Sequence, residues 1–270
     1  MQILSDTSSL AGYKGCTLVP TMGAFHEGHR SLVRIAAALD KPVVVSIFVN
    51  PKQFAPGEDL ATYPRSLDRD LEMIAADGAT AALVPSEDLM YPPGESAWSP
   101  PLPLIASDPK LEDLHRPHFF SGVCTAVARL FDLTQPSTAI LGEKDWQQLQ
   151  VIRSMVQMNA SRWPAIHIMS GPTIRESDGL AMSSRNAFLD PANRERAIAL
   201  SSALSEAIKL PPMKAELMMQ AKLLSADLDV DYAVVRDAQT LQAPLEGRPQ
   251  RALIAATLGG IRLIDNAAMS

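Results

Sequence analysis

The sequence predicts an α/β protein, with a Rossmann-like, doubly wound parallel sheet followed by a smaller C-terminal α+β domain. Short apolar runs alternate with amphipathic helical segments through the first part of the chain, which is the pattern of right-handed βαβ units. Residues 43–49 form a continuous β-branched run, as expected for a strand buried on both faces. After about residue 185, helical segments are followed by strand-like runs around Gly259-Gly260, a pattern typical of antiparallel hairpins.

The spacing of apolar residues predicts the individual helices and strands. In the first part we expect strands at 16–20, 43–49, 81–84, 138–141 and 166–169, and helices at 28–39, 67–76, 122–133 and 145–158. Residues 85–117 are rich in proline, and their apolar residues show no clear helical or strand period. We expect them to form a long excursion over one edge of the ligand site that the motifs below indicate. In the second part we expect helices at 191–210 and 213–228 and strands at 231–236, 252–258 and 261–264.

Composition narrows the class of protein. The chain has 270 residues, is 47% hydrophobic and 20% charged, which argues against disorder. A net charge of −6 does not favour a nucleic-acid or anionic-membrane partner. Cys16 and Cys124 lie in apolar runs and are interpreted as small buried hydrophobes. The first residues lack the features of a signal peptide and no run is long enough to cross a membrane, so we expect a cytoplasmic enzyme.

The first chemical motif joins an expected strand to an expected helix. It includes Pro20, Thr21, Met22, Gly23, His26, Gly28 and His29. A helix start offers unpaired N–H groups and a positive dipole end, both suited to phosphate. His26 and His29 are three residues apart and can face the same way. The alternatives are that they cap or pack the helix, or bind a metal, although no neighbouring Cys or acidic cluster completes a metal site.

A second polar group follows the buried β-branched run. Asn50 and Gln53 come where that strand ends, and ligands of open α/β sheets bind at such strand ends. Their amides can donate to a carboxylate or hydroxyl without adding charge. The alternative is a polar turn closed by Pro51.

A third group, at residues 142–148, also joins a strand end to a helix start. Gly142 lies at the bend, Lys144 can reach phosphate, and Asp145 can orient a ribose hydroxyl or water-bound Mg²⁺. Gln147 and Gln148 project from the first helical turn. The alternative is an ordinary charged cap with Asp145 at the N-cap.

The fourth group spans residues 173–186. Ser183 and Ser184 supply hydroxyl donors beside Arg185, whose guanidinium binds oxygens in pairs, so the segment predicts an adaptable phosphate clamp. The alternative is a solvated loop that ends in a helix cap.

Together the four segments resemble the pantothenate synthetases (pantoate–β-alanine ligases), a family of the HxGH nucleotidyltransferase superfamily. The resemblance extends over nearly the whole chain, through Tyr63-Pro64-Arg65, Arg116-Pro117, Gly122-Val123 and Arg262-Leu263-Ile264-Asp265-Asn266. It implies that pantoate attacks the α-phosphorus of ATP to give pantoyl adenylate and pyrophosphate. β-Alanine then attacks the acyl carbon and releases AMP.

The resemblance also implies roles for individual residues. The triphosphate and its developing charge would be held by His26, His29, Lys144, Ser183, Ser184 and Arg185. The rest of the ATP site would comprise Pro20, Thr21, Met22, Gly23, Gly142, Asp145, Ile174 and Met182. Pantoate would be bound by Gln53 and Gln148, in a region that includes Asn50, Met22, Tyr63 and Arg116.

One position departs from the family pattern. The family has Arg-Pro-x-His-Phe, whereas this chain has Arg116-Pro117-His118-Phe119. The histidine comes one place early, so the family role is not carried onto His118.

The resemblance implies a nucleotidyltransferase domain at about 1–173, which would hold ATP and pantoate, and a C-terminal lid domain at about 174–270. It further implies Mg²⁺ carried by the ATP phosphates rather than by protein ligands, and a homodimer. Two alternatives stay open: another HxGH adenylyl- or cytidylyltransferase acting on a small molecule, and a catalytically impaired nucleotide-binding relative.

Overall fold

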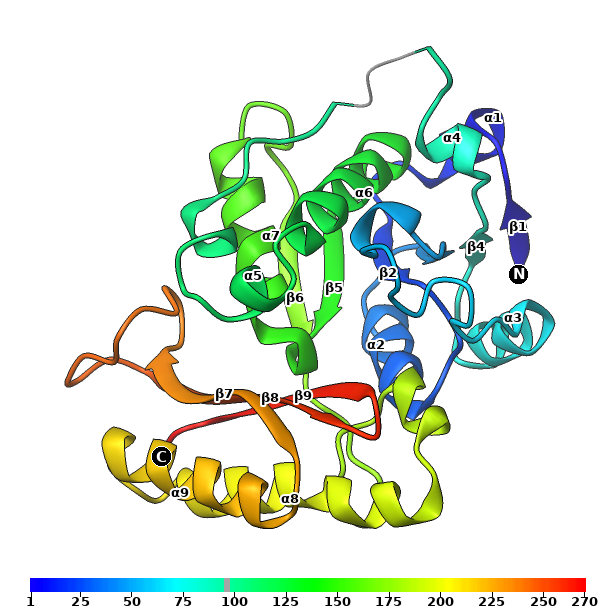
Figure 1. Ribbon diagram of the computed structural model, residues 1–270. Helices are drawn as coiled ribbons and strands as arrows, with labels where there is room; N and C mark the ends of the chain where they lie inside the picture. The colour runs from blue at the N-terminus through cyan, green and yellow to red at the C-terminus, as the bar shows by residue number, and fades with distance from the viewer. Residues whose placement is uncertain (95–97) are drawn as a thin grey trace. The chain divides into compact units, whose positions relative to one another are not determined.

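The computed structural model describes residues 1–94 and 98–270 (Figure 1). By its contacts the chain divides into two compact units. Unit 1 comprises Met1–Glu143 and Val151–Pro172, and unit 2 comprises Lys144–Gln150 and Thr173–Ser270. The short segment from Lys144 therefore belongs with the C-terminal residues. Each unit is described by itself.

Unit 1 contains a parallel sheet that confirms the predicted fold class. Within the described residues the sheet has six strands in the order β1-β4-β3-β2-β5-β6. The strands are β1 (Gln2–Leu4), β2 (Thr17–Thr21), β3 (Val43–Ile47), β4 (Ala81–Leu83), β5 (Thr138–Gly142) and β6 (His167–Gly171). The register aligns Val19 with Val45 and Leu18 with Ala139. Every residue of β3 is buried, as the continuous β-branched run predicted.

Helices join these strands. They are α1 (Thr7–Leu10), α2 (Glu27–Ala37), α3 (Leu67–Ala76), α4 (Glu87–Met90), α5 (Glu112–His115), α6 (Phe119–Thr134) and α7 (Trp146–Met158). Short 3₁₀ turns are η1 (Ala11–Tyr13), η2 (Pro51–Gln53), η3 (Leu104–Ala106) and η4 (Glu143–Asp145). The apolar face of α2 packs on β2, β3, β5 and β6. None of the helices in the described stretches is long and apolar enough to cross a membrane.

The strand order reverses beside β2. The chain moves from β2 to β3 to β4 in one direction and then returns to place β5 on the other side of β2. The loops that leave the carboxyl ends of β2 and β5 therefore start from adjacent strands at a topological switch point. In open α/β sheets this is where ligands bind.

Unit 2 is built on an antiparallel sheet. Its described strands are β7 (Asp229–Asp237), β8 (Gln250–Leu258) and β9 (Ile261–Ala268), in that order. The helices α8 (Pro191–Ala207) and α9 (Pro212–Ser225) lie along one face of this sheet (Figure 1). Small and aliphatic side chains from both layers, including Leu200, Met219 and Ile254, form one buried core.

The differences from the expected elements include the N-terminal residues and the proline-rich excursion. Strand β1, which pairs in parallel with β4, is only three residues long and shows no period from which to predict it. The proline-rich excursion at 85–117 contains α4, η3 and α5, while its residues 95–97 lie outside the described part of the chain. Cys16 and Cys124 are free and buried as predicted, and burial raises the pKa of each thiol to about 12.

Candidate active site

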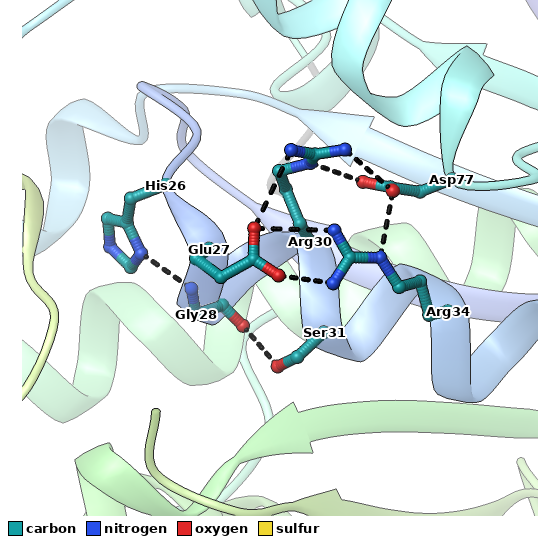
Figure 2. Close-up of polar contacts among 7 residues, drawn as sticks. All are labelled: His26, Glu27, Gly28, Arg30, Ser31, Arg34 and Asp77. Atoms are coloured by element: carbon teal, nitrogen blue, oxygen red, sulfur yellow. Dashed lines mark hydrogen bonds and ion pairs between the residues drawn. The ribbon is translucent and has the colours of Figure 1, made fainter. Parts of the chain in front are cut away.

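The first candidate motif is the loop from β2 to α2. His26 is the N-cap of α2, and its Nδ1 accepts a hydrogen bond of 3.1 Å from the Gly28 amide (Figure 2). A neutral imidazole that accepts at Nδ1 carries its proton on Nε2. The cap therefore fixes the tautomer and makes Nε2 a hydrogen-bond donor at the start of the helix.

His29 lies one turn further along α2. The His26 and His29 rings are stacked with their centroids 4.0 Å apart and their planes at 24°. Phe25 lies against His29, with its ring centroid 5.1 Å from that of the imidazole. The three-residue spacing thus brings both imidazoles together, as predicted, at a helix end whose dipole favours anions.

The charged side chains of α2 form ion pairs with one another and with Asp77. Glu27 forms ion pairs with Arg30 and Arg34, and both arginines also bind Asp77 at the end of α3 (Figure 2). Hydrogen bonding to Arg34 lowers the pKa of Glu27. Burial would raise the pKa of Asp77, but hydrogen bonds from Arg30 and Arg34 outweigh it and lower that pKa. The acidic residue beside His26 is therefore neutralised by two arginines.

The loop before His26 is held by a carboxylate that sequence reasoning missed. Asp70 is 1% exposed and accepts hydrogen bonds from the Phe25 amide at 2.9 Å and the Ser66 hydroxyl at 2.8 Å. Its other oxygen lies so close to Gly23, which has φ +71°, that a Cβ there would come within 2.7 Å. The Tyr63 hydroxyl donates to the Gly23 carbonyl at 3.0 Å. These contacts fix the path of the backbone between β2 and the histidines.

The second candidate group forms a compact turn after β3. Asn50 is 2% exposed and caps η2 by accepting from the Lys52 amide. Its Nδ2 donates to Gln53 Oε1 at 3.0 Å, while Gln53 Nε2 lies 3.1 Å from the sulfur of Met22. The structure thus brings Met22, Asn50 and Gln53 together, three of the residues expected around pantoate.

Arg116 is engaged by other protein groups. Its guanidinium binds both oxygens of Glu58, at 3.0 and 2.7 Å, and donates to the Gln53 carbonyl at 3.3 Å. It also stacks on Phe119, with Cζ 4.0 Å from the ring centroid. In this arrangement Arg116 ties η2 to the region before α6. His118 is exposed, so the early histidine and the phenylalanine that follows it occupy different environments.

In unit 2, the segment Lys144–Gln150 is anchored by residues of β8 and β9 and by the turn that follows β7. Asn266 Nδ2 donates to the Lys144 carbonyl at 2.7 Å, and Trp146 Nε1 donates to the Ala238 carbonyl at 2.8 Å. Arg251 stacks over the Trp146 ring at 3.4 Å. Lys144 Nζ lies 3.6 Å from Asp145 Oδ1. The sequence indicates Asn266 only as part of the segment 262–266, because its contact with Lys144 is tertiary and has no local signal.

The two glutamines of the third group differ in exposure. Gln147 is 4% exposed, whereas Gln148 is half-buried. The helix α7 begins at Trp146, after the 3₁₀ turn η4. Gln148 is therefore the glutamine of this pair that retains exposed surface.

The fourth group forms a small hairpin with a capped turn after it. The Met182 amide donates to the Ile174 carbonyl at 2.9 Å, and Arg175 pairs with Ala181 in an antiparallel bridge. Arg175 also makes a two-point ion pair with Asp265, which is 2% exposed. Ser183 caps the 3₁₀ turn η5 (Ser184–Phe188) by accepting from the Arg185 amide at 3.3 Å. Ser183 therefore forms a cap of the kind that the alternative for this segment described, and its phosphate role stays a prediction.

The predicted site residues thus fall into two sets. The set in unit 1 is Pro20, Thr21, Met22, Gly23, His26, His29, Asn50, Gln53, Tyr63, Arg116 and Gly142, and the set in unit 2 is Lys144, Asp145, Gln148, Ile174, Met182, Ser183, Ser184 and Arg185. Among the described residues, no group of three or more His, Cys, Asp or Glu side chains is placed to hold a metal ion.

Comparison with known proteins decides the family. The sequence profile described as "Pantoate-beta-alanine ligase" matches residues 2–268. The chain belongs to the pantoate-beta-alanine ligase family. A pantothenate synthetase of Nocardia farcinica is 46% identical over 258 residues, which cover 94% of this chain and 79% of that relative.

Solved structures of this ligase family share the fold as well. A crystal structure of pantothenate synthetase from Thermus thermophilus superposes with a TM-score of 0.90 at 37% identity and covers 99% of both chains. A pantoate-beta-alanine ligase from Francisella tularensis, solved in complex with beta-gamma ATP and beta-alanine, has a TM-score of 0.82 at 32% identity. It covers 99% of this chain and 97% of that one.

Proposed function

We propose that this chain condenses pantoate with β-alanine to form pantothenate, using ATP and passing through pantoyl adenylate. The observation that carries the proposal is the joint presence of a family match over residues 2–268 and an N-capping His26 stacked on His29 at the start of α2. The first supplies the reaction class, and the second supplies donors suited to a triphosphate.

In the first step, a pantoate carboxylate oxygen attacks the α-phosphorus of ATP, and the bond to pyrophosphate breaks. Negative charge moves onto the departing pyrophosphate. His26 and His29, at the positive end of α2, are suited to stabilise this charge by hydrogen bonding. Because His26 accepts at Nδ1, its role toward phosphate is that of a donor through Nε2.

The donors of unit 2 are assigned to the same nucleotide. Lys144, Ser184 and Arg185 offer ammonium, hydroxyl and guanidinium groups to phosphate oxygens, and Ser183 adds a hydroxyl. Gly142, Asp145, Ile174 and Met182, together with the loop after β2, are assigned to the rest of ATP. Asn266 supports this assignment because it holds the Lys144 backbone.

Pantoate is assigned to the turn after β3. Gln53, with Asn50 and Met22 beside it, lies at the carboxyl end of a central strand, which is the ligand-binding edge of such sheets. Gln148 is assigned to the same substrate. Tyr63 and Arg116 act there through the backbone, since Tyr63 binds the Gly23 carbonyl and Arg116 binds the Gln53 carbonyl.

In the second step, the β-alanine amine attacks the acyl carbon of the adenylate, AMP leaves, and the amine loses a proton. The chemistry needs no protein nucleophile, so the protein contributes by positioning and electrostatics. Mg²⁺ bound to the phosphate oxygens would neutralise charge as a Lewis acid. The hydrogen-bond donors among the site residues of unit 1 and unit 2 suit phosphate oxygens rather than a metal ion. This fits Mg²⁺ that is bound to the ATP phosphates when ATP enters the site. We further propose a homodimer, to be checked by light scattering of the purified protein.

The deciding experiment is an AMP-release assay in which pantoate and β-alanine are omitted in turn. We expect pantoate-dependent exchange of pyrophosphate into ATP without β-alanine, and AMP release only when both are present. Nucleotide retained on the product would instead indicate another HxGH transferase, and ATP binding without turnover would indicate an impaired relative.

A variant tests the role of the histidines. We expect His29→Ala to lower the rate of adenylate formation by about 100- to 1,000-fold, because it removes a donor to developing charge. Arg153→Ala, on α7, changes a cationic residue outside the assigned set and serves as the control. A near-normal kcat for His29→Ala would contradict the assigned role.

A further inference from the structure

The side-chain amide of Asn50 uses all of its hydrogen-bonding capacity. Its Oδ1 accepts from the Lys52 amide at 3.2 Å and from the Tyr91 hydroxyl at 2.6 Å. Its Nδ2 donates to the Gly122 carbonyl at 3.1 Å and to Gln53 Oε1 at 3.0 Å. An amide oxygen has two lone pairs and an amide nitrogen two hydrogens, so this set is complete in a side chain that is 2% exposed.

The orientation of Asn50 decides the orientation of Gln53. Because Asn50 Nδ2 donates to Gln53 Oε1, the oxygen of Gln53 faces Asn50 and its Nε2 faces Met22, 3.1 Å from the sulfur. The end of Gln53 that is directed away from Asn50 is therefore a donor. A flipped Asn50 would present an acceptor to Gln53 and would turn Gln53 around.

The Lys52 amide, which only donates, and the Gly122 carbonyl, which only accepts, set the orientation of Asn50. The Tyr91 hydroxyl adds a further hydrogen bond to Asn50 Oδ1. Tyr91 comes from the end of α4, far from β3 in sequence, and its own amide bonds to the Glu87 carbonyl at 2.7 Å. Phe48 packs edge-on to its ring, and Lys52 Nζ lies 3.8 Å from the ring centroid. Burial raises the pKa of Tyr91 well above its usual value, so the hydroxyl stays protonated and donates.

We propose that the Tyr91 hydroxyl is a positioning group for pantoate, which holds the Asn50 amide in the place from which Asn50 keeps Gln53 turned as a hydrogen-bond donor. This inference rests on the proposed function, because it assigns pantoate to Gln53. A carboxylate oxygen only accepts hydrogen bonds, so a donor at this position suits the acid substrate. Tyr91 itself touches Asn50 rather than the substrate.

The test is Tyr91→Phe, which removes one oxygen atom and keeps the ring. We expect the KM for pantoate to rise roughly 3- to 10-fold, in line with the loss of one hydrogen bond to a buried amide. The KM for ATP should stay within about twofold. Tyr13→Phe, which removes an exposed hydroxyl bond to Gln2 in the same unit, is the matched control and should change neither constant.

A double-mutant cycle separates positioning from general stability. If Tyr91 acts through Gln53, Tyr91→Phe should have no further effect on the pantoate KM in a Gln53→Ala background. Equal effects in both backgrounds, or an unchanged pantoate KM in Tyr91→Phe, would overturn the proposal. Should Tyr91→Phe not fold, Asn50→Asp, which loses the donor to Gln53, must raise the pantoate KM instead. An inactive wild-type protein would refute the proposed function, whereas an active wild type with an unaffected Tyr91→Phe refutes this inference alone.

Discussion

Gly122 gives the sharpest test of how the turn after β3 is positioned. It lies in α6, and a Cβ at this residue would come 2.6 Å from the Gln53 amide nitrogen and closer still to the Lys52 carbonyl. Ordinary contact at such a Cβ begins at 3.4 Å. Gly122→Ala must therefore move α6 and η2 apart by roughly 0.8 Å or more, and η2 carries Gln53.

The expected effect follows from that displacement. A misplacement of about 1 Å in a positioning element costs on the order of 100-fold in rate, which is about 2.7 kcal/mol. We therefore expect Gly122→Ala to lower kcat/KM for pantoate by about 100-fold. Helix propensity alone would make alanine more stable by about 1 kcal/mol, whereas overpacking costs about 1–3 kcal/mol. The stability should therefore not rise.

The assay is AMP release against pantoate concentration at saturating ATP and β-alanine, with urea unfolding of the same preparations. Gly12→Ala is the matched control, because a Cβ at Gly12 meets nothing within 4 Å. If Gly122→Ala kept wild-type kcat/KM for pantoate and gained stability, the close approach of α6 to η2 would have no role in placing Gln53.

Two further predictions concern residues that contact α2 and the loop before it. Asp70→Ala should lower the free energy of unfolding by about 2 kcal/mol, because the buried Phe25 amide loses its acceptor. The control Asp68→Ala, on the exposed side of α3, should change that free energy little. Equal urea midpoints for the two variants would contradict this prediction. Asp77 has a lowered pKa, so its contribution to stability is present above about pH 4, the unfolded value, and is lost as the pH falls through the folded pKa. Asp77→Asn should therefore have a lower free energy of unfolding than wild type in urea titrations at pH 7. If the difference between the two proteins did not narrow at pH 3, ionised Asp77 would not be the source of this stability.

The parts of the fold that could be predicted are those with a local signal. The β-branched run at 43–49 predicted β3, although the strand ends at Ile47 because Asn50 and Pro51 begin the turn η2. The apolar period of residues 28–39 predicted the helix α2, and His26 is its N-cap, as one of the alternatives for the two histidines stated. In contrast, β1 is stabilised by pairing with β4, which three residues of sequence do not encode locally.

The same distinction applies to the candidate site. Motif spacing indicated Gln53 and Lys144, whereas the residues that hold them are defined by tertiary contacts. Asp70 did carry a signal, because residues 67, 70, 71 and 74 share one face of α3 and a carboxylate among apolar residues there needs partners. Glu58 carried none, since its pairing with Arg116 joins residues 58 positions apart.

The buried thiols have a practical consequence for experiments on this protein. Burial raises the pKa of both thiols, so Cys16 and Cys124 stay in the weakly reactive thiol form at neutral pH, and both side chains are fully buried. A maleimide reagent should therefore leave the native chain unlabelled. A single cysteine introduced at an exposed position of unit 2 such as Met213 would accept a fluorophore selectively, so that a reporter can be placed there without removing a native cysteine.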